Sequence, residues 1–91
     1  ELAKAFDQAW PTVLTNIGEA YRRLGLYPQA IEYFSEAIDL SPDLCTPYLY
    51  RSLTYHALGQ QQQFNSDLIE SEKRSQDHLE VQLYKELFFK N

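Results

Sequence analysis

Nucleophilic or metal chemistry in this sequence would depend on Cys45, His56 and His78, the only cysteine and the two histidines among 91 residues. Cys45 and His56 lie 11 positions apart, so on one helix they would be separated by ~16 Å of axial rise and could not share a proton. His78 has Asp77 and Glu80 nearby but lacks the His and Cys spacing of a metal site. We therefore predict surface histidines and no catalytic, metal-binding or cofactor-binding residues.

Carboxylates recur at helical spacing at Glu32, Glu36 and Asp39. Such a row could supply an acid/base pair or a cation site. A solvated helix face explains it better, because nothing in the sequence indicates that these groups are buried. We expect no enzyme activity and no cofactor.

Composition narrows the classes of partner. With 13 acidic and 8 basic side chains the net charge is −5, which argues against nucleic acids and anionic membranes, since both require a basic surface. No apolar run reaches the ~18 residues of a membrane span, and no secretory signal is present. The single thiol is compatible with a reducing compartment, so we predict a cytoplasmic protein.

Apolar residues recur every three or four positions along the chain, which predicts helices and no strands. Proline and glycine divide the pattern, with Pro28 in the first turn of one helix and Thr46 as the N-cap of the next. Five helices are expected, over residues 11–24, 28–40, 46–58, 62–75 and 78–90. Their apolar faces include Val13, Ile17, Ala20, Leu24, Leu58, Phe64, Leu68 and Ile69.

The junction between the last two helices leaves two alternatives. No glycine or proline separates Lys73 from His78, so the two segments could fuse into one long helix. We expect a break, with Ser75 or Asp77 as a weak N-cap.

An internal repeat appears when the sequence is shifted by 34 positions against itself. Tyr21 then aligns with Tyr55, Leu24 with Leu58, Gly25 with Gly59 and Phe34 with Leu68. The first copy resembles the tetratricopeptide repeat family, whose signature has this period. The residues that carry the resemblance are Leu14, Ile17, Gly18, Tyr21, Ala30, Phe34, Ala37 and Pro42.

The resemblance implies an all-α, right-handed α-solenoid (an alpha-alpha superhelix) of two helix-turn-helix repeats with flanking helical segments. Repeats are expected at 11–44, with a strong match, and at 45–78, where Phe64 stands in place of a small alanine. Residues 1–10 would be the end of a preceding helix, and residues 79–91 a C-terminal capping helix. The absence of methionine suggests an excised piece of a longer array.

The resemblance also implies a concave groove lined by the first helix of each pair. We predict a module that binds a peptide or helix of another protein through Asn16, Glu19, Arg22, Arg23, Leu49, Tyr50, Leu53 and His56. Leu49, Tyr50 and Leu53 would be the apolar anchor. The alternative is that the fifth helix, or a further repeat, covers these three residues.

Other functions stay open at this point. The chain could self-associate through its ends and form a homo-oligomer, or serve as a regulatory accessory domain of a larger protein. Binding of chaperone C-terminal carboxylates, known in the family, is not expected, because Thr46 and Tyr50 stand where the clamp has cationic residues.

Overall fold

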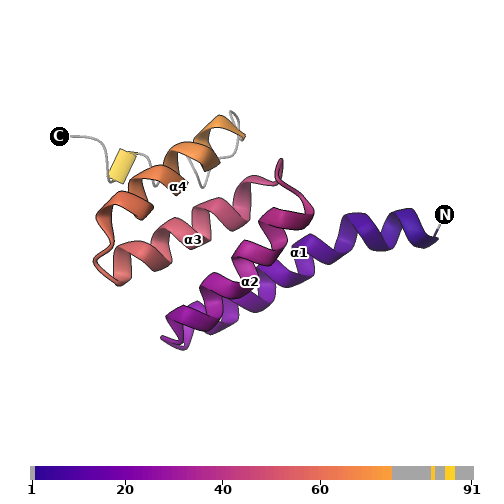
Figure 1. The fold of residues 1–91 in the computed structure, drawn as a ribbon, viewed down its shortest axis with the longest axis horizontal. Coiled ribbons are helices and arrows are strands. Elements are labelled where there is room, and N and C mark those ends of the chain that lie inside the picture. The colour runs from indigo at the N-terminus through magenta and orange to yellow at the C-terminus, as the bar shows by residue number, and fades with distance from the viewer. Residues whose placement is uncertain (1, 75–82, 84–85, 88–91) are drawn as a thin grey trace.

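A computed structural model describes residues 2–74, 83 and 86–87, with side chains from residue 9 onward. The stretch 2–74 forms four helices: α1 (Leu2–Arg23), α2 (Tyr27–Leu40), α3 (Cys45–Ala57) and α4 (Gln61–Lys73). They form two antiparallel pairs, and α3 packs beside α2 (Figure 1). Within these described ranges no residue lies in a strand, so the all-α prediction is confirmed.

The beginning of the chain differs from the predicted arrangement. Residues 2–10 are not a separate segment, because α1 continues from Leu2 through Pro11 to Arg23. Proline removes one backbone hydrogen bond from a helix interior. Here the helix continues across it, and the N-terminal part of α1 extends beyond α2 (Figure 1).

Both helix pairs turn at a glycine with a left-handed backbone, at φ 80° for Gly25 and φ 76° for Gly59. Glycine adopts this conformation without steric cost, which makes it the usual residue after a helix C-terminus. In each turn the amide after the glycine donates to a carbonyl of the preceding helix, over 2.9 Å, from Leu26 to Tyr21 and from Gln60 to Tyr55. The two turns are therefore equivalent, as the shift of 34 predicts.

The predicted start of the third helix was wrong. α3 begins at Cys45, and its N-cap position is Leu44, which makes no side-chain capping bond. Thr46 is inside the helix, with Pro47 still in the first turn. The first amides of a helix have no hydrogen-bond partner within it. A proline in the first turn is therefore compatible with more than one residue as the start of the helix.

The core of the first pair is a contact between small and large residues. Phe34 is 0% exposed, as are Ala30 and Ala37. A Cβ atom on Gly18 would lie 2.7 Å from Cε1 of Phe34, closer than carbon atoms can approach. The ring of Phe34 therefore packs where α1 has no side chain.

The core of the second pair is built differently. Phe64, which aligns with Ala30, clusters with Leu49 and Leu68, and all three are at most 2% exposed. On α3, Ser52 aligns with Gly18 and is fully buried. The second pair therefore has a large residue, Phe64, where the first pair has the small Ala30. Its two helices nevertheless pack against each other.

Several residues expected on inward faces are exposed, namely Val13 (40%), Leu24 (73%), Leu58 (40%) and Ile69 (44%). The helical period showed that they share faces with core residues, but a face is buried only where a second element covers it. α4 ends at Lys73, with Arg74 in a turn. The predicted helix at 78–90 lies outside the described residues, apart from the helical Leu83, Glu86 and Leu87.

Candidate functional site

The α1 part of the predicted groove is polar and internally paired. Glu19 accepts two hydrogen bonds from Arg22, of 2.7 and 2.6 Å, and one of 3.2 Å from Nε of Arg23. The side chain of Arg23 is 76% exposed, against 25% for Arg22 and 14% for Glu19. Asn16, nearly one turn before Glu19, is exposed. Arg23 is thus the accessible cation of this face, and Glu19 orients it.

Two of the three residues of the expected apolar anchor are not on the surface. Leu49 is 0% exposed and Leu53 is 8% exposed, so neither can receive a partner's side chain as predicted. Thr15, at the α1 position that aligns with Leu49, is likewise only 2% exposed. The position itself therefore lies inside the fold, whichever residue occupies it.

Two aromatic residues of α3 remain partly or fully accessible. Tyr50 is half-buried, and its ring centroid lies 6.0 Å from that of Phe34 in the first pair. His56 is exposed, and its ring lies 4.9 Å from that of Phe64. The predicted residues that reach the surface are therefore polar and aromatic rather than aliphatic.

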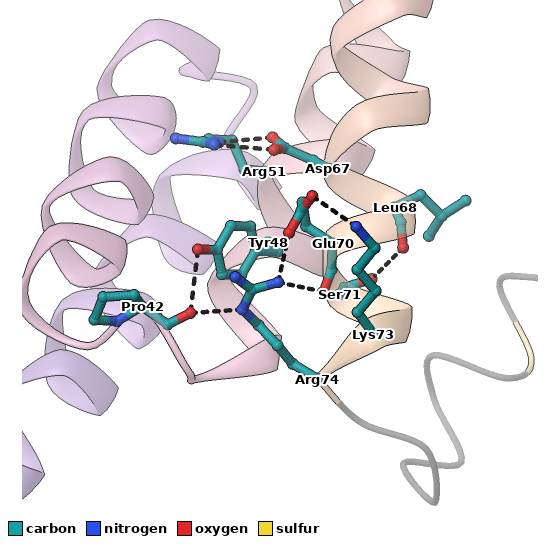
Figure 2. A network of polar contacts seen from close by, with 9 residues as sticks. All are labelled: Pro42, Tyr48, Arg51, Asp67, Leu68, Glu70, Ser71, Lys73 and Arg74. Carbon is teal, nitrogen blue, oxygen red and sulfur yellow. Dashed lines mark hydrogen bonds and ion pairs between the residues drawn. The ribbon is translucent and has the colours of Figure 1, made fainter.

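Sequence reasoning missed a charged bridge between the two repeats. Arg51 donates to both carboxylate oxygens of Asp67, over 2.6 and 2.9 Å, and to Oγ of Ser35 over 2.9 Å (Figure 2 shows the pair with Asp67). Burial alone would lower the pKa of Arg51, but its hydrogen bond to Asp67 and the Asp67 charge outweigh burial and raise it. One guanidinium thus joins α2, α3 and α4.

A comparison of equivalent repeat positions could have revealed this bridge. Arg51 aligns with Ile17 and Asp67 aligns with Tyr33. Both positions change together from uncharged to oppositely charged residues, which is the pattern of a new ion pair. In the first repeat Tyr33 instead stacks on Tyr21, with ring centroids 5.4 Å apart.

A second network fixes the end of α4 to the connector between repeats. Arg74 donates from Nε to the carbonyl of Pro42 over 2.6 Å, and its guanidinium lies 4.4 Å from the ring centroid of Tyr48 (Figure 2). The Tyr48 hydroxyl donates to the same carbonyl over 3.1 Å. These contacts tie the end of α4 and the start of α3 to the connector between the two repeats.

Arg74 also affects the pKa of a neighbouring carboxyl group. Its Nη1 donates to Oε1 of Glu70 over 2.6 Å. This hydrogen bond, opposed by desolvation and aided by the charge of Lys73, lowers the pKa of Glu70 below the usual 4.5. The ionised carboxylate is the form that holds Arg74.

We predict that the contact between Glu70 and Arg74 weakens in acid. A lowered folded-state pKa stabilises the fold above the unfolded-state value near 4.5, and this contribution is lost as the pH falls through the folded-state pKa. NMR titration of the Glu70 carboxyl should show a midpoint below 4.5. In Arg74→Gln the midpoint should rise towards that value; an unchanged midpoint would contradict the assignment.

Metal ligands and free thiols are further candidates for chemistry among the described residues. In the part of the chain with described side chains, no group of three or more His, Cys, Asp or Glu residues could hold a metal ion. Cys45 is buried and unpaired. No described helix is long and apolar enough to span a membrane.

Comparison with known proteins agrees with the repeat geometry. The tetratricopeptide repeat model matches residues 11–44, which comprise the second half of α1, all of α2 and the connector to α3. The chain is also similar to anaphase-promoting complex subunit 6 of Arabidopsis thaliana, with 31% identity over 58 residues. That match covers 64% of this chain but only 11% of the relative's length. Residues 11–44 are thus similar to the tetratricopeptide repeat family, and repeats of this kind imply a helical superhelix.

Proposed function

We propose that the chain is a protein-interaction module whose groove, formed by α1 and α3, binds an acidic peptide or helix of a partner without catalysis. Tetratricopeptide repeats generally mediate contacts between proteins, and solenoids of this kind present concave binding surfaces. The observation that carries the proposal is the orientation of Arg23 by Glu19, in which the side chain of Arg23 stays 76% exposed.

The accessible side chains favour a specific chemistry. Arg23 can form charge-assisted hydrogen bonds to a carboxylate, and the amide of Asn16 can bind a peptide main chain. Tyr50 and His56 can pack against an apolar or aromatic side chain. Glu19 and the two arginines together carry one net positive charge, which favours an acidic ligand over a basic one.

Selection of peptides from a random library on the chain tests this proposal. We expect acidic sequences to be enriched, and Arg23→Glu to weaken a selected peptide at least tenfold because the ion pair becomes a repulsion. Lys73→Glu is the matched control, since this side chain on α4 is 65% exposed and undergoes the same change of charge. Equal losses in both variants, or none in Arg23→Glu, would show that the site is elsewhere.

The burial of Leu53 limits which variants can test the groove. Leu53→Asp would place a charge in the core and reduce binding by unfolding the chain, so it cannot test the groove. His56→Ala removes an exposed ring and leaves the core intact. We expect a several-fold loss of affinity for the selected peptides, with an unchanged circular dichroism spectrum.

A further inference from the structure

The chain contains two dipeptides in which proline follows a residue with a hydroxyl group, Ser41-Pro42 and Thr46-Pro47. Serine or threonine followed by proline is the sequence that proline-directed protein kinases recognise. Such a kinase must receive the hydroxyl group and the following proline together in its active-site cleft. The surroundings of each dipeptide in the fold therefore decide which of the two can be modified.

The first dipeptide lies in the connector between the two repeats. Ser41 is half-buried, and the residues on both sides of it, 39–40 and 42–43, are exposed. The backbone of Ser41, with φ −144° and ψ 80°, is not helical, as expected for a residue that precedes proline. A kinase can therefore reach the hydroxyl of Ser41 and the ring of Pro42 without unfolding a helix.

The second dipeptide lies inside α3, which begins at Cys45. Thr46 is half-buried and Pro47 is fully buried. Access to this proline would require the first turn of α3 to unfold and separate from the rest of the molecule. Thr46 is therefore protected in the folded chain, although it belongs to the same kind of dipeptide as Ser41.

A cation already lies at the exposed connector. Arg74 donates from Nε to the carbonyl of Pro42 and from Nη1 to Oε1 of Glu70, over 2.6 Å in each case (Figure 2). Ser41 directly precedes Pro42, so a phosphate on the Ser41 hydroxyl would be close to this guanidinium. Arginine and phosphate form strong charge-assisted hydrogen bonds, and a phosphate would therefore compete with the neutral carbonyl for Arg74.

The other surroundings of Ser41 are unfavourable for a phosphate. Asp39 and Asp43 are exposed carboxylates two positions away on either side. Ser41 is also the C-cap of α2, where the helix dipole disfavours negative charge. A phosphate carries about −1.5 to −2 charges at pH 7. Pairing with Arg74 therefore determines how much the folded chain is destabilised by a phosphate at this position.

We propose that Ser41 is a phosphorylation site for a proline-directed protein kinase and that Arg74 pairs with the added phosphate. In the reaction Oγ of Ser41 forms a bond to the γ-phosphorus of ATP, and the bond from that phosphorus to the oxygen bridging to the β-phosphate breaks. ADP leaves, and a carboxylate of the kinase takes the hydroxyl proton. Arg74 then turns from the carbonyl of Pro42 towards the phosphate, which loosens the end of α4. The site is independent of the groove.

Incubation of the whole chain with a proline-directed kinase and magnesium ATP tests the site, and mass spectrometry locates the phosphate. A synthetic peptide of residues 37–51 contains both dipeptides and is too short to hold a stable helix in water. We expect Ser41 to be modified at similar rates in the chain and in the peptide. Thr46 should be modified at least tenfold more slowly in the chain than in the peptide.

Pro42→Ala is the control for kinase recognition, because it removes the proline ring and keeps the backbone carbonyl that Arg74 contacts. This variant should lose modification of Ser41. A whole chain that stays unmodified at Ser41 would refute the site, whether or not the peptide is modified. Equal rates for Thr46 in the chain and the peptide would show that the fold does not select between the dipeptides, and would also refute the proposal.

Urea unfolding of phosphorylated and unmodified chains tests the role of Arg74. The phosphate should lower the urea midpoint at least twofold more in Arg74→Gln than in the wild type, because repulsion from the two aspartates is then unopposed. Lys73→Gln is the matched control, since this neighbouring cation is 65% exposed, and the phosphate should have the same effect in it as in the wild type. An equal effect in the wild type and in Arg74→Gln would overturn the pairing.

Discussion

Phe34→Ala is expected to destabilise the chain by about 3–5 kcal/mol, the cost of removing a buried phenylalanine ring. The ring is 0% exposed and occupies the space beside Gly18, where α1 has no side chain of its own. α1 cannot close the cavity with a side chain there. Since small domains have only about 5–15 kcal/mol of stability, we expect a large fall in the urea midpoint, followed by circular dichroism.

Two further variants separate packing from helix propensity. Leu40→Ala changes a residue of the same helix that is 55% exposed, and should cost less than about 1 kcal/mol. Phe34→Leu installs the residue found at the aligned position, Leu68, and should give an intermediate loss. If Phe34→Ala cost no more than Leu40→Ala, the contact between Phe34 and Gly18 would not hold the first pair together.

Asp67→Ala is expected to cost a comparable amount, about 3–5 kcal/mol, because it leaves Arg51 partly buried without its carboxylate partner. The two side chains are only 20% and 8% exposed, so water replaces the lost hydrogen bonds incompletely. Arg51 also bonds Ser35 of the first pair, and loosening it should weaken the joint between the repeats. Urea unfolding measures the effect.

The repeat itself supplies the control for this prediction. The double variant Arg51→Ile with Asp67→Tyr installs the residues that the first pair has at Ile17 and Tyr33. Replacing both members of a buried pair by apolar residues is often neutral, so the double variant should recover most of the stability lost in Asp67→Ala. A double variant as unstable as the single one would show that packing around Asp67, and not the unpaired charge, accounts for the loss.

Much of the fold could be predicted from local sequence. The shift of 34 positions aligned Gly25 with Gly59, and both occupy left-handed turns in the structure. Gly18 and Phe34, which both belong to the family pattern, pack against each other in the first pair. Helix ends were predicted less accurately than helix positions. Pro47 is compatible with a helix start at Cys45 as well as at Thr46.

The candidate site was predicted less well. Arg23 and Asn16 are exposed on α1 as expected, whereas Leu49 and Leu53 are buried in the fold. The bridge through Arg51 was missed because it joins Ser35 and Asp67, each 16 positions away in opposite directions. Helical periodicity relates residues within one helix and carries no information about which helix covers a given face.

The sequence by itself determined the repeating unit, its turns and its small-to-large contacts, because glycine conformation and helical spacing are local properties. Only the tertiary structure decided which apolar faces are covered. Val13 on α1 and Pro47 on α3 occupy the same repeat position, yet the first is 40% exposed and the second is fully buried. The difference arises because burial depends on a neighbouring helix: α2 packs against α3, while no helix among the described residues covers Val13 of α1 in the same way.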